Sequence, residues 1–302
     1  MSADVAVDVE GRTLRLSNLD KVLYPEVGLT KGEMIAYYTA VAPVLLPHLA
    51  GRPLTVKRYP GGVDGPSFYE KNAARGTPDW VRTARLPAPG STKNRDEIDY
   101  VVVEELATLV WLANLAALEL HTPQWRVGPR GGVRGADQLV LDLDPGAPAT
   151  VVECCRVALL LRAALVADGL VPVAKTSGSK GLQVYAALAE VDPARASGYA
   201  HELATRLEAG HPDLVVSRMT RALRPGKVLV DWSQNNAAKT TVSVYSLRAR
   251  PTATVSAPVS WAEVEAGAAG TPLVLTQSDV LARLPDGDLF APLLATDRPP
   301  LP

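Results

Sequence analysis

The chain has 302 residues, of which 47% are hydrophobic, and a formal net charge of -1. This composition allows a large core and excludes a disordered or fibrous protein, so we expect one large globular domain or two lobes sharing a site. No apolar run approaches the ~20 residues that span a bilayer, and residues 1–12 lack the basic-then-apolar pattern of a secretory signal, so we expect a cytoplasmic protein without membrane contact.

The first hundred residues predict a short strand followed by a capped helix. Residues 13–16 alternate in the manner of a strand. Thr30 and Glu33 fit the capping box that begins a helix, and the apolar run after them supports it. Because proline lacks the backbone N–H, we expect Pro43 and Pro47 to limit the length of this helix.

The remaining chain alternates helical and strand-like segments. An ordered loop is predicted over 61–67 and a second helix over 104–118, and the adjacent Cys154 and Cys155 are expected to be small core residues of another helix. The segment from Arg298 is expected to fray. Strands are predicted over 138–144, 171–176, 182–188 and 227–232, with helices around 150–168 and 195–208. This order predicts an α/β or α+β fold around a mixed sheet.

Charge is unevenly distributed along the second half of the chain. Residues 218–250 contain seven basic residues and one acid, Asp231, whereas residues 251–302 contain two basic residues and six acids. A basic segment is compatible with phosphate binding, although such runs are more often solvated surface. Charge alone therefore leaves nucleic-acid binding open.

Paired carboxylates are the sharpest chemical signal. Along 138–144 the two-residue period of a strand places the leucines on one face and Asp142 with Asp144 on the other. Two close carboxylates repel each other unless a cation neutralises them or one is protonated, and oxygen ligands favour Mg²⁺ or Mn²⁺. Asp231 ends another apolar strand in the same manner, so three acids could hold two metal ions. An Asp-x-Asp before Pro-Gly also occurs as a plain strand end.

Three further segments could bind phosphate or bases. Residues 175–182 lie between two strands and could cradle a triphosphate, but Lys180 is followed by Gly181 and a strand, so this is no Walker A loop. Lys31 stands in the first turn of a helix, where a bound anion would offset the unfavourable dipole. Phe68 and Tyr69 lie in a polar loop, where they could stack on bases or anchor the loop in the core.

Ordered motifs then extend over most of the chain. They are 20–25 (DKVLYP), 30–31 (TK), 51–53 (GRP) with 57–58 (KR), 68–71 (FYEK), 119–125 (ELHTPQW), 141–146 (LDLDPG), 176–182 (TSGSKGL), 231–235 (DWSQN), 239–241 (KTT) and 245–248 (YSLR). Together they resemble the polymerase domain of bacterial LigD-type repair proteins, a branch of the archaeo-eukaryotic primase superfamily.

The resemblance implies an α+β (mixed α/β), primase-like catalytic fold with central mixed or antiparallel sheets flanked by helices. It implies one domain over 1–302, with a DNA-end-binding lobe over about 1–135, a catalytic lobe over 136–295 and a tail over 296–302. The implied activity is template-dependent nucleotidyl transfer that adds ribo- or deoxynucleotides at DNA ends and short 5′-phosphorylated gaps, with two Mn²⁺ or Mg²⁺ ions, Mn²⁺ preferred. Implied partners are DNA, nucleoside triphosphates, Ku and an ATP-dependent DNA ligase, in a cytoplasmic, nucleoid-associated setting.

Site residues carry over by motif position. Asp142, Asp144 and Asp231 match metal ligands. The nucleotide-binding residues implied are Lys57, His121, Ser177, Lys180, Gln183, Arg224, Gln234, Lys239 and Arg248. The DNA-binding residues implied are Asn18, Lys21, Lys31, Phe68, Tyr69 and Lys71. Two positions depart from the family pattern, since Gln183 stands where histidine is usual and Tyr69 replaces the second phenylalanine of a pair.

Two other functions remain open at this point. One is a non-catalytic module that binds or bridges DNA ends within a repair complex. The other is an Asp-x-Asp glycosyltransferase, which leaves Asp231 and the paired lysines unexplained. No ligase nucleophile motif is present, so the chain is either a stand-alone actinobacterial primase-polymerase or a domain of a larger protein. End joining and excision repair are both compatible with it.

Overall fold

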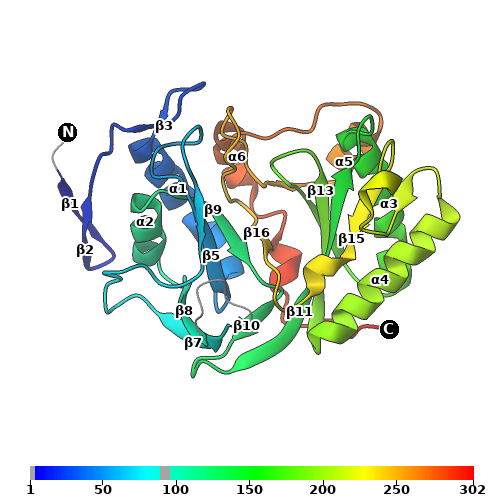
Figure 1. Cartoon of the computed structure of the whole chain (residues 1–302), viewed down its shortest axis with the longest axis horizontal. Helices are drawn as coiled ribbons and strands as arrows, with labels where there is room; N and C mark the ends of the chain where they lie inside the picture. The colour runs from blue at the N-terminus through cyan, green and yellow to red at the C-terminus, as the bar shows by residue number, and fades with distance from the viewer. Residues whose placement is uncertain (1–3, 89–95) are drawn as a thin grey trace.

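Two β-sheets stand side by side between outer layers of helices (Figure 1). The structure is a computed structural model that describes residues 4–88 and 96–302. The first sheet has the order β16-β9-β5-β8-β7 with β6 paired to β5, and the second has the order β14-β15-β11-β13-β12-β17 with β10 paired to β11. The pairings are antiparallel except between β14 and β15.

The structure contains the strands expected over 138–144, 171–176, 182–188 and 227–232, whereas the strands of the first sheet were not predicted. The first sheet contains β5 (Pro53–Arg58), β6 (Phe68–Glu70), β7 (Thr83–Pro87), β8 (Glu97–Val102), β9 (Ala117–Thr122) and β16 (Thr241–Val242). The second contains β10 (Trp125–Val127), β11 (Val133–Pro145), β12 (Pro172–Thr176), β13 (Leu182–Val191), β14 (Val215–Val216), β15 (Val228–Asp231) and β17 (Pro258–Val259). Two ribbons pair β1 (Val5–Val9) with β2 (Arg12–Leu16) and β3 (Val22–Tyr24) with β4 (Leu29–Thr30).

Helices cover the outer faces of the two sheets. They are α1 (Lys31–Leu49), α2 (Leu106–Asn114), α3 (Val151–Ala167), α4 (Pro193–Gly210), α5 (Trp261–Ala268) and α6 (Gln277–Arg283), with short 3₁₀ turns η1 (Arg221–Leu223), η2 (Trp232–Asn235), η3 (Leu284–Asp286) and η4 (Ala291–Leu294). In Figure 1, α1 and α2 lie outside the first sheet, and α3, α4 and α5 lie outside the second. Among the described residues, no helix is long and apolar enough to cross a membrane.

Helix α1 begins as expected but does not end as expected. Its capping box is present, with Glu33 N–H donating to the Thr30 hydroxyl and the Glu33 carboxylate accepting from Thr30 N–H. The prediction that Pro43 and Pro47 limit its length is wrong, because the helix continues to Leu49. A proline inside a helix costs about 3 kcal/mol, and the burial of one whole side of α1 against α2 and the first sheet outweighs that cost.

Three further expectations need correction. Helix α2 ends at Asn114 rather than near 118, because the chain turns at Ala116, where φ is +58°, and enters β9. Phe68 and Tyr69 lie in strand β6, paired with β5, and not in a loop. The end of the chain does not fray from Arg298, since Arg298 Nη1 donates to the Asp137 carboxylate at 2.9 Å and Ala189 N–H donates to the Pro299 carbonyl.

Strand β11 positions the acids. Its leucines Leu139, Leu141 and Leu143 are fully buried against α3 and α4, with Cys154 and Cys155 in the same core. The period of two turns the alternate residues toward the first sheet, where Val140 joins the other core cluster. Asp142 and Asp144 therefore emerge on the face between the two sheets. The division into lobes at about residue 135 stays a prediction, and β16 returns to the first sheet from beyond it.

Candidate active site

Four polar residues form a row across adjacent strands of the second sheet. Asp231 on β15 is opposite Asp142 on β11, Asp142 is opposite Gln183 on β13, and Gln183 is opposite Lys175 on β12. We call Asp231, Asp142, Gln183 and Lys175 the cross-strand row. Directly opposed residues of antiparallel strands lie about 4.5–5.5 Å apart at Cα and share a face. Asp144, two residues beyond Asp142, shares that face, so the structure brings all three aspartates together.

The three carboxylates disfavour one another's charge. Burial, and next the charge of Asp144, raise the pKa of Asp142 to about 7, against the opposing hydrogen bond from Gln183 Nε2. Burial and the charge of Asp231 raise the pKa of Asp144. A positive charge close to these carboxylates would favour their ionised form.

The donor set suits a hard divalent cation. Within residues 4–88 and 96–302, no group of three or more His, Cys, Asp or Glu side chains is arranged so that it could hold a metal ion. Asp231 instead accepts hydrogen bonds from Ser233 N–H at 3.0 Å and from Gln234 Nε2 at 2.8 Å. Three carboxylates without sulfur or imidazole fit Mg²⁺ or Mn²⁺ better than zinc.

Lys175 is a site residue that the sequence analysis did not single out. It is only 1% exposed, and its ammonium donates to Gln183 Oε1, to the Val242 carbonyl at 3.1 Å and to Ser256 Oγ at 2.6 Å. The one available signal was a lysine inside the apolar stretch 172–176, because a lysine in a central strand needs buried acceptors.

The loop between β12 and β13 is shaped by its own hydroxyl and glycines. Ser177 Oγ accepts from Ser179 N–H at 3.2 Å and from Gly181 N–H at 3.1 Å. Gly178 has φ +64°, and a Cβ there would lie 2.5 Å from Arg248 Cγ, so this position needs glycine. Lys180 is exposed on the same loop. The loop therefore presents backbone, hydroxyl and ammonium donors beside the cross-strand row.

Glu119 is the second site residue that the sequence analysis missed. Its carboxylate accepts from Arg248 Nε at 3.2 Å and Ala249 N–H at 3.0 Å, and it is 3.1 Å from His121 Nε2. Burial alone would raise its pKa, but the His121 and Arg248 contacts and the Ala249 N–H together lower the pKa to about 2. Burial lowers the pKa of His121. Glu119 thereby holds two predicted nucleotide-binding side chains, and Arg248 reaches the loop by donating to the Ser177 carbonyl.

An aromatic platform lies beside His121. Tyr69 meets the His121 ring edge to face at 5.6 Å, and Lys57 Nζ lies 5.4 Å from the centre of the Tyr69 ring. Phe68 packs under the Arg58 guanidinium. Phe68 and Tyr69 remain 45% and 58% exposed, so both rings can still receive a base. Lys71 follows them and is exposed.

A second cationic group lies near the start of the chain. Lys31 is buried, and its ammonium donates to the Ser17 carbonyl at 2.6 Å. Asn18, with φ +53°, accepts from Lys21 N–H through its carbonyl. Burial, and next the charge of Lys21, lower the pKa of Lys31 to about 8. The structure thus gathers Asn18, Lys21 and Lys31, and their role in binding DNA stays a prediction.

The remaining predicted nucleotide-binding residues approach the aspartates from the basic segment. Burial and the charge of Asp231 raise the pKa of Asp144, and the positive charge of Arg224 opposes this rise. Arg224 Nη2 donates to the Met219 carbonyl at 2.7 Å. Lys239 is exposed and donates to Ser233 Oγ, which itself bonds Asp231. Both cations therefore belong to the surroundings of the cross-strand row.

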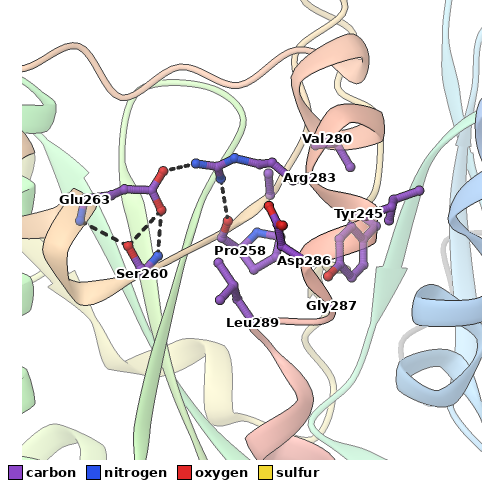
Figure 2. A pocket seen from close by; sticks show the side chains of 11 residues that line it. Tyr245, Pro258, Ser260, Glu263, Val280, Arg283, Asp286, Gly287 and Leu289 are labelled. Carbon is purple, nitrogen blue, oxygen red and sulfur yellow. Dashed lines mark hydrogen bonds and ion pairs between the residues drawn. The ribbon is translucent and has the colours of Figure 1, made fainter.

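One cavity borders the loop between β12 and β13, and a second lies elsewhere in the fold. One, of about 380 Å³, is bordered by Pro145, Lys180, Gly181 and the start of α3, so it opens between the aspartate strand and the loop. The other, of about 230 Å³, lies between α6 and β17, where Arg283 pairs with Glu263 (Figure 2). None of the predicted site residues lines this second cavity.

Comparison with known proteins identifies the family. The family model of the LigD primase-polymerase domain matches residues 30–290. The multifunctional non-homologous end joining protein LigD of Mycolicibacterium smegmatis is 44% identical over 285 residues, which cover 93% of this chain and 36% of that protein. The bifunctional non-homologous end joining protein LigD of Bacillus subtilis is 31% identical over 273 residues, covering 90% of this chain and 42% of that protein.

A solved structure agrees with this assignment. The polymerase domain from Mycobacterium tuberculosis ligase D in complex with DNA matches with a TM-score of 0.88 and 43% identity, covering 94% of this chain and 98% of that one. The expected primase-like α+β fold is confirmed. The chain spans between a third and a half of the length of these two curated relatives. The cross-strand row, the loop beside it and the match along nearly all of the chain lead to one conclusion: the chain belongs to the LigD primase-polymerase family.

Proposed function

We propose that the protein is a template-dependent nucleotidyltransferase that adds ribo- or deoxynucleotides at DNA ends and short 5′-phosphorylated gaps during DNA repair. The observation that carries this proposal is the meeting of Asp142, Asp144 and Asp231 on one face of the sheet. The loop that carries Ser177 follows β12 directly, two residues after Lys175 of the cross-strand row. Arg248 reaches this loop through the Ser177 carbonyl. A glycosyltransferase would use the Asp-x-Asp pair alone and would leave these features without a role.

The three aspartates would hold two divalent ions, with Mn²⁺ preferred over Mg²⁺. Bound there, such ions lower the pKa of an attacking hydroxyl and neutralise the charge on a triphosphate. Arg248, Lys180, Lys239 and the backbone of 177–181 would bind the triphosphate. His121, neutral because of its lowered pKa and with its Nε2–H directed to Glu119, would offer Nδ1 as an acceptor to a nucleotide hydroxyl without adding charge. Attack of the primer 3′-hydroxyl on the α-phosphorus then releases pyrophosphate.

The first lobe would hold the DNA. Phe68 and Tyr69 would stack on template bases, because their rings are exposed and backed by Arg58 and Lys57. Lys21 and Lys31 would bind the 5′-phosphate on the far side of a gap, where a phosphate would offset the mutual repulsion of the two ammonium groups. In the cell this places the protein on nucleoid DNA, with Ku and an ATP-dependent DNA ligase as the proposed partners.

Gap filling on a 5′-phosphorylated substrate tests the proposal. Ribonucleotides and deoxynucleotides are compared, each with Mn²⁺ and with Mg²⁺. We expect Asp142→Ala to abolish nucleotide addition while DNA binding stays measurable, because Asp142 lies on β11 whereas the proposed DNA-binding residues lie around β3, α1 and β6. A wild-type protein that binds these ends but adds no nucleotide under any condition would instead be a non-catalytic bridging module.

A further inference from the structure

The cross-strand row contains a buried lysine whose partners are all accounted for. Lys175 has three N–H donors and no acceptor, and it meets three acceptors: Gln183 Oε1, the Val242 carbonyl and Ser256 Oγ. Such a buried ammonium is costly unless every donor is paired. The lysine therefore needs the carbonyl end of the Gln183 amide.

The demand of Lys175 sets the direction of the Gln183 amide. With Oε1 turned to the ammonium, the amide NH₂ group is left facing β11, where Nε2 donates to Asp142 Oδ1 at 3.0 Å. A flipped amide would present Oε1 to the Asp142 carboxylate and NH₂ to the ammonium, and both contacts would be repulsive. The hydrogen bonds thus run in one direction, from Lys175 through Gln183 to Asp142.

We propose that Lys175 is a positioning residue that orients the Asp142 carboxylate through the amide of Gln183. The proposal rests on the assignment of Asp142 as a metal ligand made above. A neutral imidazole could also accept from Lys175 and donate to Asp142. Groups that orient a metal ligand typically change metal affinity 10–100-fold when removed.

The proposal differs in sign from a purely electrostatic role. If Lys175 acted only as a positive charge near the aspartates, replacing it with a neutral residue would tighten the binding of a cation. If it orients Asp142 through Gln183, the same replacement weakens that binding. The sign of the change therefore separates the two roles.

The test measures binding of Mn²⁺ alone to the full chain, by electron paramagnetic resonance of free Mn²⁺ at constant pH and ionic strength, without DNA or nucleotide. We expect Lys175→Met and Gln183→Leu each to raise the Kd at least about 10-fold, and the double variant to be no worse than either single one. We expect Gln183→His to bind within a few-fold of wild type. Lys227→Met is the charge-matched control, because Lys227 is partly exposed and its ammonium donates to the Pro212 carbonyl, outside the cross-strand row.

We call the path of hydrogen bonds from Lys175 through Gln183 to Asp142 the relay. The outcomes test the metal site and the relay separately. Wild-type binding by Asp142→Ala would refute the metal site and the relay with it. Loss of binding in Asp142→Ala together with unchanged or tighter binding in Lys175→Met, or additive effects in the double variant, would refute the relay alone. If Lys175→Met does not fold, as judged by circular dichroism and thermal melting, Gln183→Leu against Gln183→His decides: equal Kd values overturn the relay.

Discussion

At the scale of single residues, the site depends on charged groups that are buried together. Glu119 and Lys175 are both nearly inaccessible to solvent, and each is tolerated only because its partners are charged or strong hydrogen-bonding groups. Asp142 and Asp144 are in the opposite position, since their nearest charged neighbours include each other and Asp231. The first sheet therefore carries a buried carboxylate, Glu119, whose charge has partners, whereas the carboxylates of the second sheet favour a cation.

Glu119→Gln should expose the acid dependence of the fold. The folded pKa of Glu119 is about 2, below its ordinary value of 4.5, so its stabilisation is present above about pH 4.5 and is lost as the pH falls toward 2. We expect the variant to lose on the order of 3 kcal/mol of unfolding free energy at pH 7. Urea denaturation between pH 7 and pH 3 should show this difference shrinking.

The control for this variant is Glu190→Gln, which removes an exposed carboxylate 3.8 Å from Arg134 and should change stability by less than about 1 kcal/mol. A Glu119→Gln deficit that stays the same from pH 7 to pH 3 would contradict the assignment of the low pKa to Glu119.

At the scale of elements, helices α3 and α5 come close together at a position where a glycine carries no side chain. Helix α5 lies against α3 through Gly267, where an added Cβ would be 2.7 Å from Cys155 Sγ. In α4, by contrast, a Cβ on Gly198 would meet nothing within 4 Å. The packing of α5 on α3 therefore requires a glycine at position 267, whereas the surroundings of Gly198 leave room for a side chain.

Gly267→Ala should destabilise the protein by about 1–3 kcal/mol, because overpacking exceeds the gain in helix propensity. Gly198→Ala should be neutral or stabilising by up to about 1 kcal/mol, since only propensity changes there. Thermal melting of the two variants checks both, and adding Cys155→Ala to Gly267→Ala should restore most of the loss. A Gly267→Ala protein as stable as wild type would show that α5 moves freely on α3.

Features of the fold that depend on the local periodicity of residues could be predicted from the sequence. The capping box of α1, four of the seven strands of the second sheet and the shared face of Asp142 and Asp144 follow from residue spacing alone. Lys175 and Glu119 were missed because their roles depend on which strands become neighbours, and strand register is a tertiary property. The continuation of α1 through two prolines was missed for a related reason, since packing rather than propensity decides it.

At the scale of the whole molecule, the two lysines proposed to bind the 5′-phosphate and the aspartates lie on different elements. Lys21 directly precedes β3 and Lys31 is the first residue of α1, whereas the aspartates belong to β11 and β15. Figure 1 shows β3 and α1 on the side of the first sheet, and β11 and β15 in the second. A substrate that reaches both must carry a 5′-phosphate at a distance from its 3′-hydroxyl. The two lysines should therefore favour the binding of gapped or broken DNA and leave the nucleotidyl-transfer step itself unaffected.

Lys21→Met with Lys31→Met tests this separation. We expect the double variant to lose any preference for 5′-phosphorylated over unphosphorylated gaps, and to retain extension of a template-primer without a downstream strand. Paired gap-filling assays on the two substrates measure the ratio. A variant that keeps the wild-type ratio would remove the two lysines from 5′-phosphate recognition.

Strand β11 is paired with β15 from Asp142 to Pro145 and with β13 as far as Leu143. The backbone at Asp142 therefore has a paired strand on each side, whereas the pairing to β13 ends one residue before Asp144. In the proposed metal site, fitting ions of different radius would then fall to rotation of the Asp142 side chain on a backbone held from both sides, which makes discrimination between small and large divalent ions a question of rotamers at that residue.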